Sequence, residues 1–212
     1  MVLQRISTNQ GRRDETPNLE LARDLAGARD RAGIAEIAAN LSNEKEGVRN
    51  DCIKVLYEIG TIDPELIAEY APDFLRLLQD RNNRMVWGGM TALSASAPLQ
   101  AGLLCQHFDE ITRAIEAGSV ITCDHGVRVL ASLAASEEKC SQAAFAYLLE
   151  TLQTCRPKDV PQFAEFALRR VNTKNGGEFV GVLEKRLTQL SAPQAKRVRK
   201  VIREAQRTEA KE

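Results

Sequence analysis

The sequence predicts an all-α protein, a right-handed superhelix of about five helical hairpins that follow one another along the chain. Branched apolar residues return at nearly constant intervals of 37, 40, 35 and 34 residues, at Leu56, Leu93, Leu133, Leu168 and Ile202. Each of these anchors lies in an apolar pattern of helical period, which buries one stripe of a helix against its neighbours. Strands would show strict alternation instead. One supersecondary unit, repeated and stacked, therefore explains the chain.

Each repeat is expected to pair its anchored helix with a second amphipathic helix. In the first anchored stretch the apolar residues recur at steps of three and four, at Val48, Cys52, Val55, Leu56 and Ile59. The same spacing surrounds the second and the last anchors. Companion helices are predicted at residues 64–78, 99–117, 137–152 and 179–190. The unit is therefore a helical hairpin.

Turn residues agree with this phasing. Asp63 precedes Pro64, which is a capping residue before a proline at the first helical position. Asn82 and Asn83 break the second hairpin as turn residues, and Ser191, shortly before Pro193, can open the last helix. All connections are short, so successive helices are expected to lie antiparallel and side by side.

Residues 47–59 resemble a known repeat. They contain the Val-Arg pair Val48 and Arg49, then the small residue Cys52, then an apolar pair one turn later. This stretch is similar to the second helix of a HEAT or armadillo-type repeat, and the pattern extends over residues 31–205, although Val86 replaces the arginine in the second unit. The resemblance implies an α-solenoid whose second helices line a concave face, with partner-binding candidates Arg49, Trp87 and Arg128.

The predicted organisation is a mobile segment at residues 1–16, one repeat domain at 17–207 and a frayed end at 208–212. The first residues are polar and lack the apolar core of a signal peptide. No stretch approaches the roughly 18 consecutive apolar residues that a membrane span needs. We therefore expect a cytoplasmic protein without a membrane partner.

Catalytic and metal-binding patterns do not emerge from the sequence. Cys105 lies near His107, and Cys123 near His125, but neither pair has the second pair of ligands that a zinc site needs. A nucleophile needs a base held against it, and these two histidines do not lie in a recognisable motif. The glycines after Asn175 follow a helix and lack the lysine of a phosphate-binding loop. We expect no enzyme activity, no metal and no cofactor.

The zero net charge hides a strong asymmetry along the chain. Residues 1–155 carry 15 basic and 22 acidic side chains, a net charge of −7, whereas residues 156–212 carry 14 and 7, a net charge of +7. Five cations recur at steps of three and four on the last predicted helix, opposite its apolar stripe: Lys196, Arg199, Lys200, Arg203 and Arg207. Arg169, Arg170 and Lys174 are candidates to extend this basic ridge. The alternative is a solvated capping helix, because the terminal unit of a repeat protein needs a polar outer face.

Trp87, the only tryptophan, lies close to Arg84 and one position away from the buried stripe of its helix. Partial exposure would make this pair an anchor for a partner. The alternative is that Trp87 packs between neighbouring hairpins.

Two hypotheses about function follow. The first is a non-catalytic scaffold that binds another protein, one with an acidic surface, through the concave face and the basic ridge. The second is a nucleic-acid binder that uses the basic helix. HEAT-like alkylpurine DNA glycosylases are similar in architecture, but their site places aromatic residues around an aspartate, and this chain lacks a matching Trp-Asp cluster.

Overall fold

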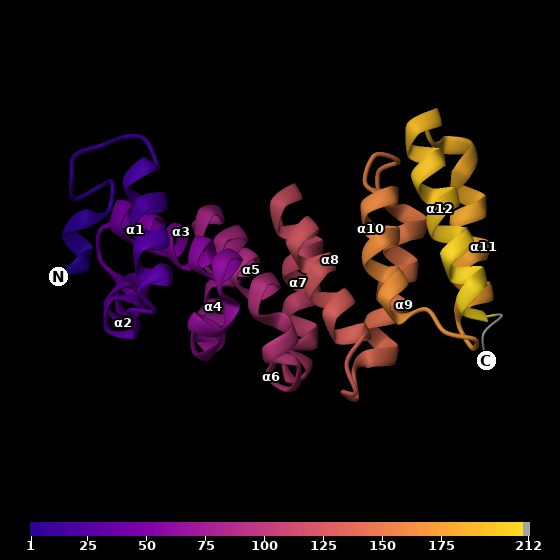
Figure 1. Cartoon of the computed structure of the whole chain (residues 1–212), viewed down its shortest axis with the longest axis horizontal. Coiled ribbons are helices and arrows are strands. Elements are labelled where there is room, and N and C mark those ends of the chain that lie inside the picture. Colours follow the sequence, from indigo (N-terminus) through magenta and orange to yellow (C-terminus); the bar gives the residue numbers. More distant parts are fainter. Residues whose placement is uncertain (210–212) are drawn as a thin grey trace. The chain divides into compact units, whose positions relative to one another are not determined.

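A computed structural model of the chain confirms the all-α helical-repeat class (Figure 1). It describes residues 1–209, which form twelve α-helices, seven short 3-10 segments and no strand. The α-helices are α1 (Thr16–Gly27), α2 (Arg31–Ala39), α3 (Glu46–Ile62), α4 (Ala71–Leu77), α5 (Asn83–Ser96), α6 (Ala101–Gln106), α7 (Phe108–Ala117), α8 (Val120–Ala134), α9 (Ser141–Thr154), α10 (Val160–Ala167), α11 (Gly176–Arg186) and α12 (Ala192–Glu209). The 3-10 segments are η1 (Val2–Arg5), η2 (Asn40–Ser42), η3 (Pro64–Leu66), η4 (Ala68–Tyr70), η5 (Ala97–Leu99), η6 (Leu168–Arg170) and η7 (Leu187–Gln189).

The chain forms two compact units with a boundary inside α8. Unit 1 is Met1–Gly126 and unit 2 begins at Val127. The sequence predicts one repeat domain over residues 17–207. Whether the two units form one domain remains a prediction.

In unit 1, the hairpins α2–α3 and α4–α5 place α1, α3 and α5 side by side (Figure 1). Two consecutive glycines in α5 make this spacing possible. A Cβ on Gly88 would lie 2.7 Å from Ile53 of α3, and a Cβ on Gly89 would lie 2.9 Å from the carbonyl oxygen of Phe74 in α4. The two adjacent glycines therefore permit α5 to pack closely against α3 on one side and against α4 on the other.

In unit 2, α10 and α11 both pack against α12, and α9 packs against both α10 and α11. The apolar stripe of α12 is buried at Val198, Val201, Ile202 and Ala205, as its helical period predicts. Its cationic side faces away from this core.

Four of the five predicted anchors are buried, namely Leu56, Leu93, Leu133 and Ile202. The prediction is wrong for Leu168, which lies in η6 and is only half-buried. Phe163 and Ala167 fill the core at the corresponding helix. The helix α10 ends at Ala167, so the backbone no longer carries residue 168 onto the buried stripe.

Two companion helices are interrupted where the sequence predicts continuous ones. Pro72 lies in the first turn of α4, so the stretch before it forms η3 and η4 instead of an α-helix. A proline has no amide proton and clashes with the carbonyl of the preceding turn. The predicted helix at 99–117 divides into α6 and α7 at His107, whose Nδ1 lies 3.0 Å from Glu110 Oε1.

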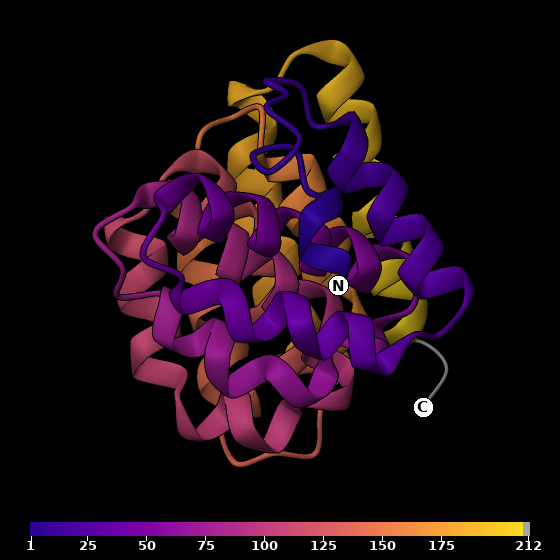
Figure 2. The same ribbon diagram turned by 90° about the vertical axis from the view of Figure 1, so that its left-hand side faces the viewer.

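The N-terminal residues, which the sequence predicts to be a mobile segment over 1–16, pack on unit 1 beside α1 and α2 (Figure 2). Ile6 is fully buried. The Ser7 amide donates to Asn18 Oδ1 over 2.9 Å, and the Thr8 amide donates to Asp51 Oδ2 over 2.7 Å. The sequence could not predict this packing from helical periodicity, because the segment is held by single hydrogen bonds to side chains that lie far away along the chain.

At the other end, α12 includes the first two residues of the predicted frayed tail, and residues 210–212 lie outside the described part of the chain. Among the described residues, no helix is long and apolar enough to cross a membrane.

Candidate partner-binding surfaces

Arg84 and Trp87 of α5 form a cluster with Lys54 and Tyr57 of α3. The rings of Tyr57 and Trp87 lie 5.8 Å apart at 52°. The Arg84 guanidinium lies 5.6 Å from the centre of the Trp87 ring, and Lys54 Nζ lies 4.9 Å from that of Tyr57. Cations over aromatic faces are attracted by the negative charge of the π-system. Trp87 therefore packs on the preceding hairpin and also remains partly exposed.

Glu15, which immediately precedes α1, completes this cluster. Its carboxylate lies 2.5 Å from Arg84 Nη2 and 3.2 Å from Lys54 Nζ. Desolvation alone would raise the pKa of Glu15, but the hydrogen bonds from Arg84 and Lys54 outweigh it, so the pKa is lowered from 4.5. Lys54 also pairs with Glu58 over 2.7 Å. The charges of this cluster are thus largely neutralised within unit 1.

The other two predicted groove residues lie in different surroundings. Arg49, near the start of α3, is half-buried and donates to the Asn43 carbonyl oxygen over 3.1 Å, so it ties the preceding loop to the helix. Arg128 belongs to unit 2, where its exposed guanidinium lies 5.0 Å from the ring centre of Phe166 in α10. The role of both as partner contacts remains a prediction.

The basic ridge on α12 is exposed, as the sequence predicts. Arg197 pairs with Glu165 of α10 over 2.8 Å, and Lys200 lies 3.8 Å from Glu204. Four further cations are exposed and form no ion pair with any described residue: Lys196, Arg199, Arg203 and Arg207. Because α12 repeats these cations at one-turn spacing, their like charges repel one another in the folded protein.

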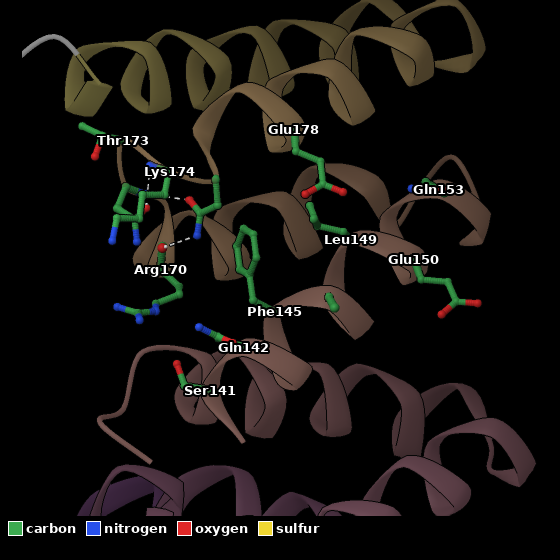
Figure 3. Close-up of a pocket in the computed structure, with 13 residues that line it drawn as sticks. Ser141, Gln142, Phe145, Leu149, Glu150, Gln153, Arg170, Thr173, Lys174 and Glu178 are labelled. Carbon is green, nitrogen blue, oxygen red and sulfur yellow. Dashed lines mark hydrogen bonds between the residues drawn. The ribbon is translucent and has the colours of Figure 1, made fainter. Parts of the chain in front are cut away.

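The three residues proposed to extend this ridge separate into two groups. Arg169 is exposed in η6. Arg170 and Lys174 line the rim of a groove of about 710 Å³ on α9 (Figure 3). The apolar period of α9 predicts only a companion helix and gives no sign of this groove. Its lining joins α9 to residues 170–178, and no local pattern along the chain relates these two stretches.

Ser94 of α5 and His125 of α8 form a polar contact within unit 1. Ser94 Oγ lies 2.8 Å from His125 Nδ1 and also donates to the Thr91 carbonyl oxygen over 2.8 Å. Which of the two atoms donates depends on the tautomer of the imidazole. Within residues 1–209 no group of acidic, histidine and cysteine side chains could hold a metal ion.

No protein-family model and no curated protein matches the chain. Solved structures do resemble it. The crystal structure of an engineered protein, structural genomics target OR329, matches with a TM-score of 0.69 at 15% identity and covers 98% of this chain and 96% of that one.

Two further structures agree. Engineered target OR497 has a TM-score of 0.67 at 14% identity, over 96% of this chain and 58% of that one. The designed armadillo repeat protein YIII(Dq)4CqI has a TM-score of 0.63 at 14% identity, over 96% and 98%. At such low identity the likeness describes backbone arrangement and carries no function. The chain therefore has the armadillo/HEAT-like helical-repeat fold.

Proposed function

We propose that this protein is a non-catalytic scaffold that binds an acidic surface of another protein. The observation that carries the proposal is the group of four exposed α12 cations without an ion partner among the described residues, Lys196, Arg199, Arg203 and Arg207. The partly exposed Trp87 and its neighbours on α3 and α5 supply a second contact surface.

The repulsion among the like charges of the ridge supports a role for these residues beyond contact with solvent. Pairs of like charges at three- and four-residue spacing destabilise a helix by about 0.2 to 0.5 kcal/mol each. A capping helix needs only a polar outer face, and mixed charges would supply it without that repulsion. An acidic partner would neutralise these charges on binding. The relief of their repulsion would then add to the free energy of binding.

Protein fits this surface better than nucleic acid does. Single-stranded nucleic acid is held by cations together with aromatic side chains on which bases stack. The described part of α12 contains no aromatic residue, and the only tryptophan lies in α5, packed against Tyr57. Duplex binding through phosphates alone would need only the cations, so it remains the second candidate function.

A charge-reversal variant with a matched control tests the proposal. The ridge variant carries Lys196→Glu, Arg199→Glu, Lys200→Glu and Arg203→Glu. The control variant carries the same change in net charge at exposed residues of unit 1, with Arg13→Glu, Arg23→Glu, Lys45→Glu and Arg81→Glu. Affinity capture from a cell extract should recover proteins that bind wild type and the control but are lost from the ridge variant.

Equal losses from both variants would show a net-charge effect, and no losses would show that the ridge is only a solvated face. Both results contradict the proposal. A gel shift with duplex DNA at two salt concentrations tests the second candidate, because phosphate binding weakens steeply as salt rises through counterion release. A ridge-dependent shift with that salt dependence would favour nucleic acid over an acidic protein.

A further inference from the structure

A groove in unit 2 has the features of a second binding site, independent of the basic ridge (Figure 3). Its lining comes from α9, from residues 170–175 and from Glu178 in the first turn of α11. Phe145 and Leu149 form its apolar floor, and the ring of Phe145 lies 6.4 Å from that of Phe179. The floor is thus an extension of the unit 2 core toward the surface.

The two ends of the groove carry opposite charges. Arg170 and Lys174 lie at one end, and Glu150 and Glu178 lie toward the other, with Phe145 between them (Figure 3). None of these four charged side chains forms an ion pair with another residue in the described part of the chain. Side chains that neutralise one another are unavailable to a ligand, whereas these four remain available.

The cationic rim is held in a fixed shape by its own hydrogen bonds. Asn172 Oδ1 accepts from the Lys174 amide over 2.9 Å, and Asn175 Oδ1 accepts from the Asn172 amide over 2.8 Å. Asn175 Nδ2 also donates to the Arg170 carbonyl oxygen over 3.2 Å. Binding a ligand here therefore loses little conformational entropy in the backbone that carries Arg170 and Lys174.

The length of the groove indicates what it holds. Its lining follows α9 from Ser141 to Gln153, about 18 Å at the rise of an α-helix. A second hollow, of about 380 Å³, shares Ser141, Gln142 and Arg170 with it and continues beyond this end past Glu137, Glu138 and Lys139. An extended peptide rises about 3.3 Å per residue, so the groove accommodates a segment of about six residues.

We propose that this groove binds an extended segment of another polypeptide. The segment has acidic side chains at one end for Arg170 and Lys174, an apolar side chain in the middle for the Phe145 floor, and a basic side chain at the other end for Glu150 and Glu178. Charge complementarity along the groove fixes this order, and the apolar residue supplies the area that leaves water.

Selection from a random heptapeptide display library against the full chain tests the proposal. Enriched peptides should share an apolar residue flanked by acidic residues on one side and a basic residue on the other. Their dissociation constants, measured by fluorescence polarisation, are then compared among variants. Enrichment of peptides without this charge order, or no enrichment at all, would overturn the proposal.

Two pairs of variants locate the binding site. Ala146 and Ala143 are both exposed on α9, but only Ala146 lines the groove, so Ala146→Arg should abolish binding while Ala143→Arg leaves it unchanged. The double variant Arg170→Glu and Lys174→Glu should weaken binding of the enriched peptides about tenfold, through loss and reversal of two exposed ion pairs. The same double variant should select peptides with basic residues at both ends. Equal effects of the two alanine variants, or an unchanged preference after charge reversal, would place the peptide elsewhere and refute the assignment.

Discussion

Replacing Arg186 with methionine should destabilise unit 2, because this buried arginine caps the last turn of α9. Arg186 is only 5% exposed. Its Nη1 donates to the carbonyl oxygens of Leu152 and Gln153 over 2.8 and 2.5 Å, and its Nη2 donates to that of Cys155 over 2.6 Å. The last carbonyls of a helix have no partner within the helix, so one side chain of α11 satisfies several of them.

The expected loss follows from these contacts. Hydrogen bonds to a charged group contribute about 1.5 to 3 kcal/mol each, but three bonds from one guanidinium are not additive. Removal of the cation also relieves the desolvation of a buried charge. Since methionine keeps the apolar stem, we expect a net loss of about 2 to 4 kcal/mol. Arg186→Lys should recover only part of it, because an ammonium lacks the planar fork that reaches two sides of the helix end.

Urea unfolding followed by far-ultraviolet circular dichroism measures this loss. The intrinsic fluorescence is unsuitable, since Trp87 lies in unit 1. The matched control is Lys185→Met, a change at the exposed neighbour of Arg186 on the same helix, which should alter stability by less than about 0.5 kcal/mol. Hydrogen exchange should become faster in the last turn of α9 in the Arg186 variant alone. If the two methionine variants lose the same small amount, the capping argument is wrong.

Three further predictions concern unit 1 and the ridge. Leu93 is fully buried, so Leu93→Ala should cost about 2 to 5 kcal/mol, whereas Arg203→Ala on the exposed ridge should cost little; thermal melts that shift equally would contradict the assignment of buried and exposed faces. Glu15 has a lowered pKa in the folded state, so its stabilising contribution is present above pH 4.5 and is lost as the pH falls through the folded value. Glu15→Gln should therefore flatten the pH dependence of stability in that acidic range, and urea midpoints with unchanged pH dependence would refute this. Burial, aided by nearby carboxylates, raises the pKa of Cys52 to about 12, so the native protein should resist alkylation of this thiol at neutral pH; mass spectrometry that finds it modified before unfolding would show that the site opens.

Much of the fold could be predicted from local patterns. The apolar periods identified the second helix of each hairpin, and Asp63 does cap the element that follows it, since its Oδ1 accepts from the Glu65 amide. Asn82, which the sequence indicates only as a turn residue, also caps α5, since its Oδ1 accepts from the Arg84 amide. The interruption at Pro72 was not predicted, although proline acts through the backbone of its own turn. The prediction for Leu168 was wrong because α10 ends at Ala167, so the side chain of Leu168 does not point along the buried stripe.

The candidate surfaces were predicted only in part. Repeated charges on α12 indicated an exposed ridge, because a helix with one apolar stripe must present its other side to solvent. The neighbours of Arg84 could not be read in this way, since Glu15 lies 69 residues earlier in the chain. Arg186 is a cation on the apolar stripe of α11, and this position alone could have indicated a buried charge. No sequence pattern indicated that its acceptors are carbonyl oxygens at the end of α9.

By itself, the sequence determined the all-α class, the recurrence of the second helices and the buried stripe of most of them, because these depend on the spacing of neighbouring residues along one helix. The tertiary structure decided which polar side chains meet, among them Glu15 with Arg84, Asp51 with the N-terminal segment, and Arg170 with the α9 groove. Such contacts join side chains from separate helices, and their distances depend on how closely those helices pack. Gly88 shows the reason, since its missing side chain permits the close approach of α5 to α3, the two helices that carry Trp87 and Tyr57.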